Sequence, residues 1–231
     1  MMGILDDFVH LLYPHLCVSC GASLLSQEEL ICLTCIHDKL TKTNFHLVKG
    51  NPVEKLLHGR CRVEKASAYY YFGKAGVVQN LLHQIKYKGV KEAAQKVGKL
   101  YGYSLKDANA FSMVDYIIPV PLHKKKERKR GFNQSEYFGN GLSETLEIPL
   151  LTENLIRNKE TETQTRKSRY NRYENVTDIF DVLSPEILSG KEILLVDDVI
   201  TTGATLEACI NSLTAKCKDL KVNVAAIAFP N

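Results

Sequence analysis

Two adjacent carboxylates, Asp197 and Asp198, stand at the end of a continuous apolar run and just before a turn rich in threonine. The run at residues 192–197, EILLVD, is typical of a strand that is covered on both faces. Ligands of open α/β sheets bind at the carboxyl ends of such strands. An amphipathic helix is predicted after the turn, and its first N–H groups are unpaired and suit a phosphate monoester. The segment therefore predicts a strand–turn–helix phosphate site.

The turn supplies five candidate phosphate-binding residues, which are Thr201, Thr202, Gly203, Ala204 and Thr205. Gly203 permits tight curvature of the backbone, and the threonine hydroxyls can donate hydrogen bonds to phosphate oxygens. The two carboxylates would repel a phosphate, so we interpret them as acceptors for sugar hydroxyls with a magnesium ion nearby. The simpler alternative is that the aspartates only end a strand and that a threonine caps the helix.

A strongly basic segment follows another apolar run. Residues 118–134 read IPVPLHKKKERKRGFNQ, which we interpret as a strand, a proline turn, a basic loop and the start of a helix. Positive charge gathered in this way would neutralise a pyrophosphate, and Lys125, Arg128 and Arg130 are the candidate ligands. The sequence does not choose among the three, and a solvated charged face is the alternative interpretation.

A long polar stretch at residues 157–180 interrupts the pattern of apolar runs. It carries four arginines and one glutamine, and Gln164 and Arg169 are the candidate substrate-binding residues. Long polar loops inside α/β domains tend to be functional lids, so the stretch predicts closure over a charged substrate. A plain surface loop is the alternative.

Four cysteines near the N-terminus form two CxxC pairs, Cys17 with Cys20 and Cys32 with Cys35. Four thiolates at this paired spacing satisfy a tetrahedral zinc ion and leave no open position for chemistry, so the predicted site is structural. Redox pairs or buried free thiols are the alternatives. His15 and His37 lie close enough in sequence to replace a cysteine ligand.

The elements that must position these residues alternate between strands and helices. Strands are expected at residues 66–72, 114–120, 148–156, 192–197 and 222–229, and helices at 75–88, 90–105, 133–146 and 206–217. This order predicts an α/β fold with a parallel sheet flanked by helices. We expect a zinc-binding knuckle and connector at residues 1–50 and the main domain at residues 51–231. The segment of residues 41–60 spans this boundary and is expected to be a connector.

The composition is ordinary for a globular protein, with 45% hydrophobic residues and a net charge of +4. No apolar run approaches the roughly 18 residues of a membrane span. The N-terminus carries Asp6 and Asp7 and lacks a basic start, so no secretory signal is predicted. The cysteines fit a reducing compartment, and we expect a cytoplasmic location.

Residues 193–205 resemble the signature of type I phosphoribosyltransferases, which bind 5-phosphoribosyl diphosphate (PRPP). The resemblance implies that Asp197 and Asp198 act as catalytic residues that hold the ribose hydroxyls, and that the turn holds the 5′-phosphate. Three motifs, PVPL…RGFNQ, T..Q…SR..R..N….F and VDDVITTGAT, together with the double CxxC, resemble the ComF family of competence proteins. The expected fold is thus a type I phosphoribosyltransferase-like sheet with an N-terminal zinc knuckle.

The ComF resemblance implies a protein that binds PRPP with magnesium and is linked to DNA uptake in natural competence. If it is an enzyme, the reaction is phosphoribosyl transfer with pyrophosphate as the leaving group, and no recognisable motif specifies the acceptor. The alternative is a non-catalytic protein that binds single-stranded DNA and partners a competence helicase. In that reading Tyr170, Tyr173 and Phe132 would stack on bases.

Overall fold

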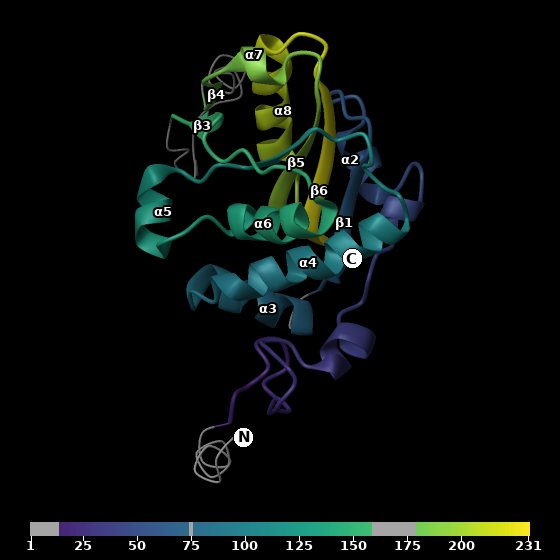
Figure 1. Cartoon of the computed structure of the whole chain (residues 1–231), viewed down its shortest axis with the longest axis vertical. Coiled ribbons are helices and arrows are strands. Elements are labelled where there is room, and N and C mark those ends of the chain that lie inside the picture. Colours follow the sequence, from purple (N-terminus) through teal and green to yellow (C-terminus); the bar gives the residue numbers. More distant parts are fainter. Residues whose placement is uncertain (1–13, 74–75, 159–178) are drawn as a thin grey trace, which may run out of the picture.

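The computed structural model of this chain describes residues 14–73, 76–158 and 179–231 (Figure 1). Its centre is a four-stranded sheet in the order β1-β6-β5-β2, and every pair of neighbours in it is parallel. The strands are β1 Ala66–Phe72, β2 Tyr116–Pro119, β5 Glu192–Val199 and β6 Lys221–Pro230. The predicted parallel α/β sheet is therefore confirmed.

Helices cover both faces of the sheet because the strands are apolar on both faces. Along β5, Leu194 and Val196 belong to the buried cluster on the side of α3 Val77–Tyr87, α4 Lys91–Asp107 and α6 Gln134–Leu146. Ile193 and Leu195 belong to the other cluster, which includes the apolar side of α8 Ala204–Lys216. In Figure 1, α3, α4 and α6 gather below the strands, while α8 lies beside β5.

Helices α4 and α6 pack with almost no space between their backbones. A Cβ atom on Gly98 would lie 2.2 Å from the Phe138 carbonyl oxygen, and one on Gly141 would lie 2.1 Å from that of Gln95. These distances are far below van der Waals contact, so glycine is required at both positions. The close crossing fixes α6, whose first turn faces the end of β5.

Smaller elements complete the chain and correct several expectations. They are α2 Pro52–Leu57, α5 Lys124–Arg130, α7 Pro185–Leu188 and the antiparallel pair β3 Leu155–Arg157 with β4 Phe180–Val182. The connector expected at residues 41–60 thus contains a helix, which Asn51 caps by accepting the N–H groups of Val53 and Glu54. The strand expected at 148–156 is reduced to β3 and an isolated bridge between Ile117 and Leu150.

The cysteine-rich segment packs directly on the helical face of the sheet, below α3 in Figure 1. Cys17, Cys32 and Cys35 are buried in the same apolar cluster as the interior residues of α3 and α4. The Ser19 hydroxyl donates to the carbonyl oxygen of Val77 at 2.8 Å. The segment therefore shares its core with the sheet domain.

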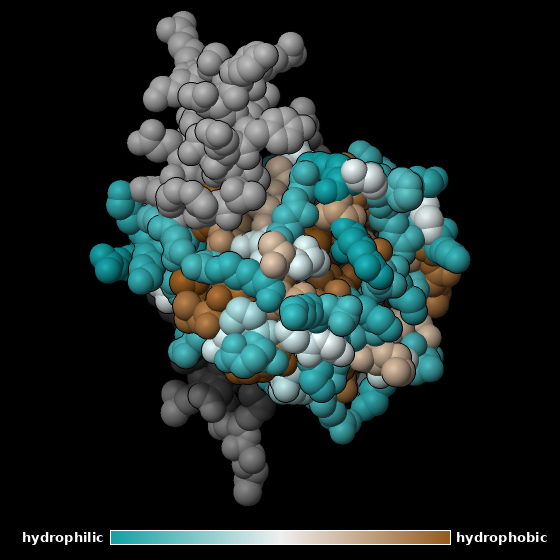
Figure 2. Space-filling model, turned by 90° about the horizontal axis from the view of Figure 1, so that it is seen from above, coloured by the Kyte–Doolittle hydropathy of each residue, from teal (hydrophilic) through white to brown (hydrophobic). Residues whose placement is uncertain are grey.

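The exposed face of the described residues mixes polar and apolar side chains. On the face seen in Figure 2, hydrophobic residues emerge in patches between hydrophilic ones. Within residues 14–73, 76–158 and 179–231, no helix combines the length and the apolar character that crossing a membrane requires.

Candidate functional site

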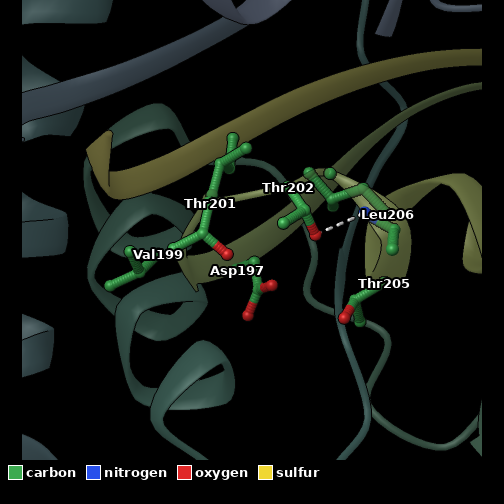
Figure 3. Close-up of a pocket in the computed structure, with 9 residues that line it drawn as sticks. Asp197, Val199, Thr201, Thr202, Thr205 and Leu206 are labelled. Carbon is green, nitrogen blue, oxygen red and sulfur yellow. Dashed lines mark hydrogen bonds between the residues drawn. The ribbon is translucent and has the colours of Figure 1, made fainter. Parts of the chain in front are cut away.

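The predicted turn forms an open hollow at the carboxyl end of β5. Asp197 and residues 199–206 line this hollow. Gly203 has a φ of 72°, in the left-handed region, immediately before α8 begins. Figure 3 shows the side-chain oxygens of Asp197 and Thr205 on the same side of the loop. The strand–turn–helix is thus confirmed as a local structure, and its helix start opens onto the hollow.

The two neighbouring aspartates have different partners. The Asp197 carboxylate accepts hydrogen bonds from the Ser135 hydroxyl at 3.0 Å and from the backbone N–H of Asp198 at 2.8 Å. The Asp198 carboxylate forms an ion pair with the Lys86 ammonium, at 2.9 Å between Nζ and Oδ2. One acid is therefore held by the first turn of α6 and the other by the last turn of α3.

The surroundings of Asp197 raise the pKa of its carboxyl group. Burial raises the pKa of Asp197 to about 7, and the charge of Asp198 adds to this rise. The hydrogen bonds from Asp198 and Ser135 and the positive charge of Lys86 act in the opposite direction. The carboxyl group thus changes between an acceptor and a potential donor near neutral pH.

Sequence reasoning missed both Lys86 and Ser135. Lys86 has 23% of its side chain exposed and Asp198 has 13%, so the ion pair is largely shielded from water. A lysine in the last turn of an amphipathic helix is ordinary, and a serine after RGFNQ is a common helix-start residue. Neither carries a local signal that would point to β5.

The basic segment forms a helix, α5, so the prediction of a basic loop was wrong. His123 caps it through Nδ1, which accepts the N–H of Lys125, and Gly131 ends it with a φ of 83°. A run of lysine and arginine has good helix propensity but no apolar periodicity, so the pattern gave no helix signal. Lys125 and Arg128 are exposed. They lie on a helix that precedes α6 in the chain, and neither of them lines the hollow at Asp197.

Arg130 differs from the other cations of α5 because it is partly buried. Its guanidinium donates to Gln134 Oε1 at 3.0 Å and lies 5.7 Å from the ring centroid of Tyr87. Phe132 is only 8% exposed and packs edge-on against Tyr137. The expectation that Phe132 stacks on bases was therefore wrong, because its ring is enclosed by the protein.

The predicted lid lies mostly outside the described residues. Gln164 and Arg169, together with Tyr170 and Tyr173, fall within residues 159–178, which the structure does not describe. The two ends of the stretch are the paired strands β3 and β4, where the Arg157 guanidinium lies 5.3 Å from the Phe180 ring centroid. Burial lowers the pKa of Arg157, and the negative charge of Asp197 opposes that shift.

The four cysteines form one compact cluster with all sulfurs within 4.8 Å of one another. The Cys17 and Cys35 sulfurs are 3.8 Å apart, and those of Cys20 and Cys32 are 3.7 Å apart. A zinc ion at about 2.3 Å from four tetrahedral sulfurs separates each pair by about 3.8 Å. The spacing therefore fits zinc, and the cluster could hold that ion with a closed set of four ligands.

Comparisons with known proteins agree with this geometry. Residues 133–231 match the family model described as a phosphoribosyl transferase domain. DNA utilization protein YhgH of Shigella flexneri is 30% identical over 208 residues, which cover 84% of this chain and 88% of that protein. Competence protein F of Haemophilus influenzae is 31% identical over 152 residues, which cover 64% of this chain and 66% of that protein. Competence protein ComFC of Bacillus subtilis is 27% identical over 222 residues, which cover 87% of this chain and 84% of that protein.

The parallel sheet, the loop after Asp198 and the matched family model define a phosphoribosyltransferase-like domain, here with an N-terminal cysteine cluster that could bind zinc. Its relatives are named for competence and DNA utilization, and they align with most of the chain. The chain belongs to the ComF family.

Proposed function

We propose that this protein binds a 5-phosphoribosyl ligand, with PRPP as the principal candidate, at the loop of residues 201–205. The observation that carries the proposal is the hollow at the end of β5, where a carboxylate and the open start of α8 face the same space. The helix start suits the 5′-phosphate, and the Asp197 carboxylate suits the ribose hydroxyls. Magnesium would bind with the diphosphate of PRPP, since that ion prefers phosphate and carboxylate oxygens.

The residues around the hollow suggest how a diphosphate would be accommodated. Lys86 brings a shielded positive charge to the acid pair, and it could shift from Asp198 towards the diphosphate when ligand enters. Lys125 and Arg128 on α5 are exposed, and they remain candidates for contact with the pyrophosphate together with Arg130. Gln164 and Arg169 would approach from the segment between β3 and β4.

If the protein is a transferase, the bond between ribose C1 and the pyrophosphate oxygen breaks as a bond forms from C1 to an acceptor nucleophile. Both electrons of the broken bond leave with pyrophosphate. The protein's contribution would be electrostatic, because cations stabilise the leaving group while Asp197 and Asp198 fix the sugar. No protein nucleophile is needed.

We further propose a link to DNA uptake, because the relatives are named competence and DNA utilization proteins. The observation that favours direct binding of single-stranded DNA is α5, whose residues 124–129 are all exposed and include five cations against Glu127. Such a helix can follow a phosphate backbone. In this second candidate function, a helicase partner would act on the same strand.

The cysteine cluster is proposed to hold a structural zinc ion. A reducing compartment such as the cytoplasm would keep the four sulfurs available as thiolates. The ion would fix the segment of residues 17–35 against α3 and would take no part in transfer chemistry, because all four positions around it are occupied by protein.

Titration calorimetry with PRPP, and separately with ribose 5-phosphate, in the presence of magnesium tests the ligand. We expect saturable binding that is lost when Asp197→Asn and Asp198→Asn are combined. The matched control is Asp107→Asn, an exposed change at the far end of α4, which should bind as the unmodified protein does. The absence of binding to the unmodified protein would refute the proposal.

The DNA function is tested by the salt dependence of single-stranded DNA binding. Replacing Lys124, Lys126 and Lys129 by glutamine should weaken binding and should reduce the slope of log affinity against log salt by about two for three lost contacts. A variant with an unchanged affinity and slope would exclude α5 as the DNA-binding surface. PRPP binding is measured on the same variant, so that the two functions are separated.

A further inference from the structure

We infer that Arg60 is a positioning residue for the phosphate loop, and that the chain between the cysteine cluster and the sheet thereby reaches into the site. Arg60 follows α2 in a turn where Gly59 has a φ of 74°. Its Nη1 donates to the Thr202 carbonyl oxygen at 2.6 Å, across 142 residues of sequence. As a role in binding, this inference rests on the proposed function of the loop.

The contact addresses a specific problem of phosphate loops. A loop that turns its N–H groups towards a ligand must turn some of its carbonyl oxygens away, and those oxygens then need donors. The Thr202 carbonyl finds its donor in the guanidinium of Arg60. A hydrogen bond from a charged donor is about twice as strong as one between neutral groups. This bond therefore fixes the orientation of the Thr202 carbonyl group.

A second contact ties the same side chain to α8. Both Nε, at 3.1 Å, and Nη2 of Arg60 donate to Glu207 Oε2 in the first turn of that helix. Arginine can make these bonds together with the one to Thr202 because its guanidinium presents several donors in a fixed plane. The Arg60 side chain is 34% exposed and that of Glu207 is 30%, so the pair is partly shielded.

This pair has an electrostatic consequence for the ligand. A carboxylate in the first turn of a helix stabilises the helix, but Glu207 would also repel a phosphate bound at the same helix start. Arg60 offsets that charge where the repulsion would be felt. The side chain therefore does two things, since it orients the Thr202 carbonyl and it neutralises Glu207.

Packing around Gly203 supports the same conclusion. A Cβ atom at this position would lie 3.3 Å from Arg60 Nη1 and 3.2 Å from Leu57 Cδ2. The loop is thus seated against α2 and the turn that follows it. Sequence reasoning placed residues 41–60 in a connector, and nothing local to that segment indicated a contact with Thr202.

Hydrogen exchange of the backbone amides at residues 201–205 tests the inference without any ligand. Arg60→Gln should speed this exchange by about tenfold or more, because it removes charge-assisted hydrogen bonds. The matched control is Arg62→Gln, whose side chain is 84% exposed and is paired loosely with Glu64 at 3.8 Å. Equal exchange in the Arg60→Gln variant and the unmodified protein would overturn the inference.

Calorimetry with ribose 5-phosphate and magnesium gives the second readout. Arg60→Gln should raise Kd by about 10-fold to 100-fold, and combining it with Glu207→Gln should recover part of the loss by removing the uncompensated carboxylate. No recovery would overturn the neutralising role. If the unmodified protein binds no ribose 5-phosphate, the proposed function fails, and the exchange experiment still decides the role of Arg60.

Should Arg60→Gln fail to fold by circular dichroism, Arg60→Lys provides the second variant. Lysine keeps the charge and loses the planar set of donors, so we expect exchange and Kd between those of the unmodified protein and the loss described above. Values equal to those of the unmodified protein would show that the geometry of arginine is not needed, and would overturn its positioning role.

Discussion

The cysteine cluster and the phosphate loop are both irregular segments, but they are fixed in opposite ways. The cluster takes its four sulfurs from residues 17–35, so the groups that fix it are close neighbours in sequence. The loop at residues 201–205 is held from a distance, since Arg60 bonds to Thr202 and Lys86 and Ser135 hold the acids before it. The cysteine cluster is thus built from residues that are near in sequence, whereas the phosphate loop depends on contacts from distant parts of the domain.

The strongest test of this contrast is removal of the cluster's ligands. Combining Cys17→Ser with Cys35→Ser should abolish zinc binding and lower the free energy of unfolding by about 5 kcal/mol or more, since structural zinc sites contribute binding energy to folding. Zinc content and chemical denaturation measure the two effects. Cys61→Ser is the control and should retain about one zinc per chain. An unmodified protein with less than about half an equivalent of zinc after reduction would contradict the structural site.

The acid pair should make the stability of the fold depend on pH. Because the folded pKa of Asp197 is raised to about 7, protonation of this carboxyl group stabilises the folded state. This contribution to the free energy of unfolding is complete below the unfolded pKa of about 4 and is lost as the pH rises through 7. The loss is at most about 1.4 kcal/mol per pH unit between pH 4.5 and 6.5, and it levels off above pH 7. Denaturation of the unmodified protein and of Asp197→Asn across this range measures the difference. Parallel curves would show that Asp197 has an ordinary pKa.

Replacement of Lys86 tests the support that α3 gives to the loop. Lys86→Met should destabilise the protein by about 2 kcal/mol, less than a fully buried pair would, because it leaves the Asp198 carboxylate without its cation. It should also raise the pKa of Asp197 further, since the Lys86 charge lowers it. Lys88→Met, at an exposed position two residues later, is the control. Equal stability of the two variants would exclude the ion pair as a support.

The smallest expected effect concerns the seat of the loop. Gly203→Ala should cost about 1 kcal/mol for the left-handed backbone conformation alone, and slightly more because its Cβ meets α2. Gly190→Ala is the matched control, since its φ is 73° and no atom lies within 4 Å of the added Cβ. Thermal denaturation gives both values. A smaller cost at Gly203 than at Gly190 would contradict the close packing of the loop.

The predictability of each part from sequence follows from the same contrast. Local spacing alone identifies the two CxxC pairs, the apolar strand before Asp197 and the glycine at position 203. The sequence indicated these features correctly. Arg60 and Lys86 act across the fold, and a single basic residue carries no sign of its distant partner. The helix α5 was missed for another reason, because its residues touch no core and so show no apolar period.

The position of β6 in the sheet also affects how the protein is made. β6 lies between β1 and β5 but is synthesised after both. While the chain grows on the ribosome, β1 and β5 cannot pair with β6, the strand that separates them. The hydrogen bond between Arg60 and Thr202 likewise cannot form until the chain has grown by the 142 residues between them. The sheet beside the phosphate site is therefore complete only after β6 has been made, and until then β1 and β5 each have an open strand edge.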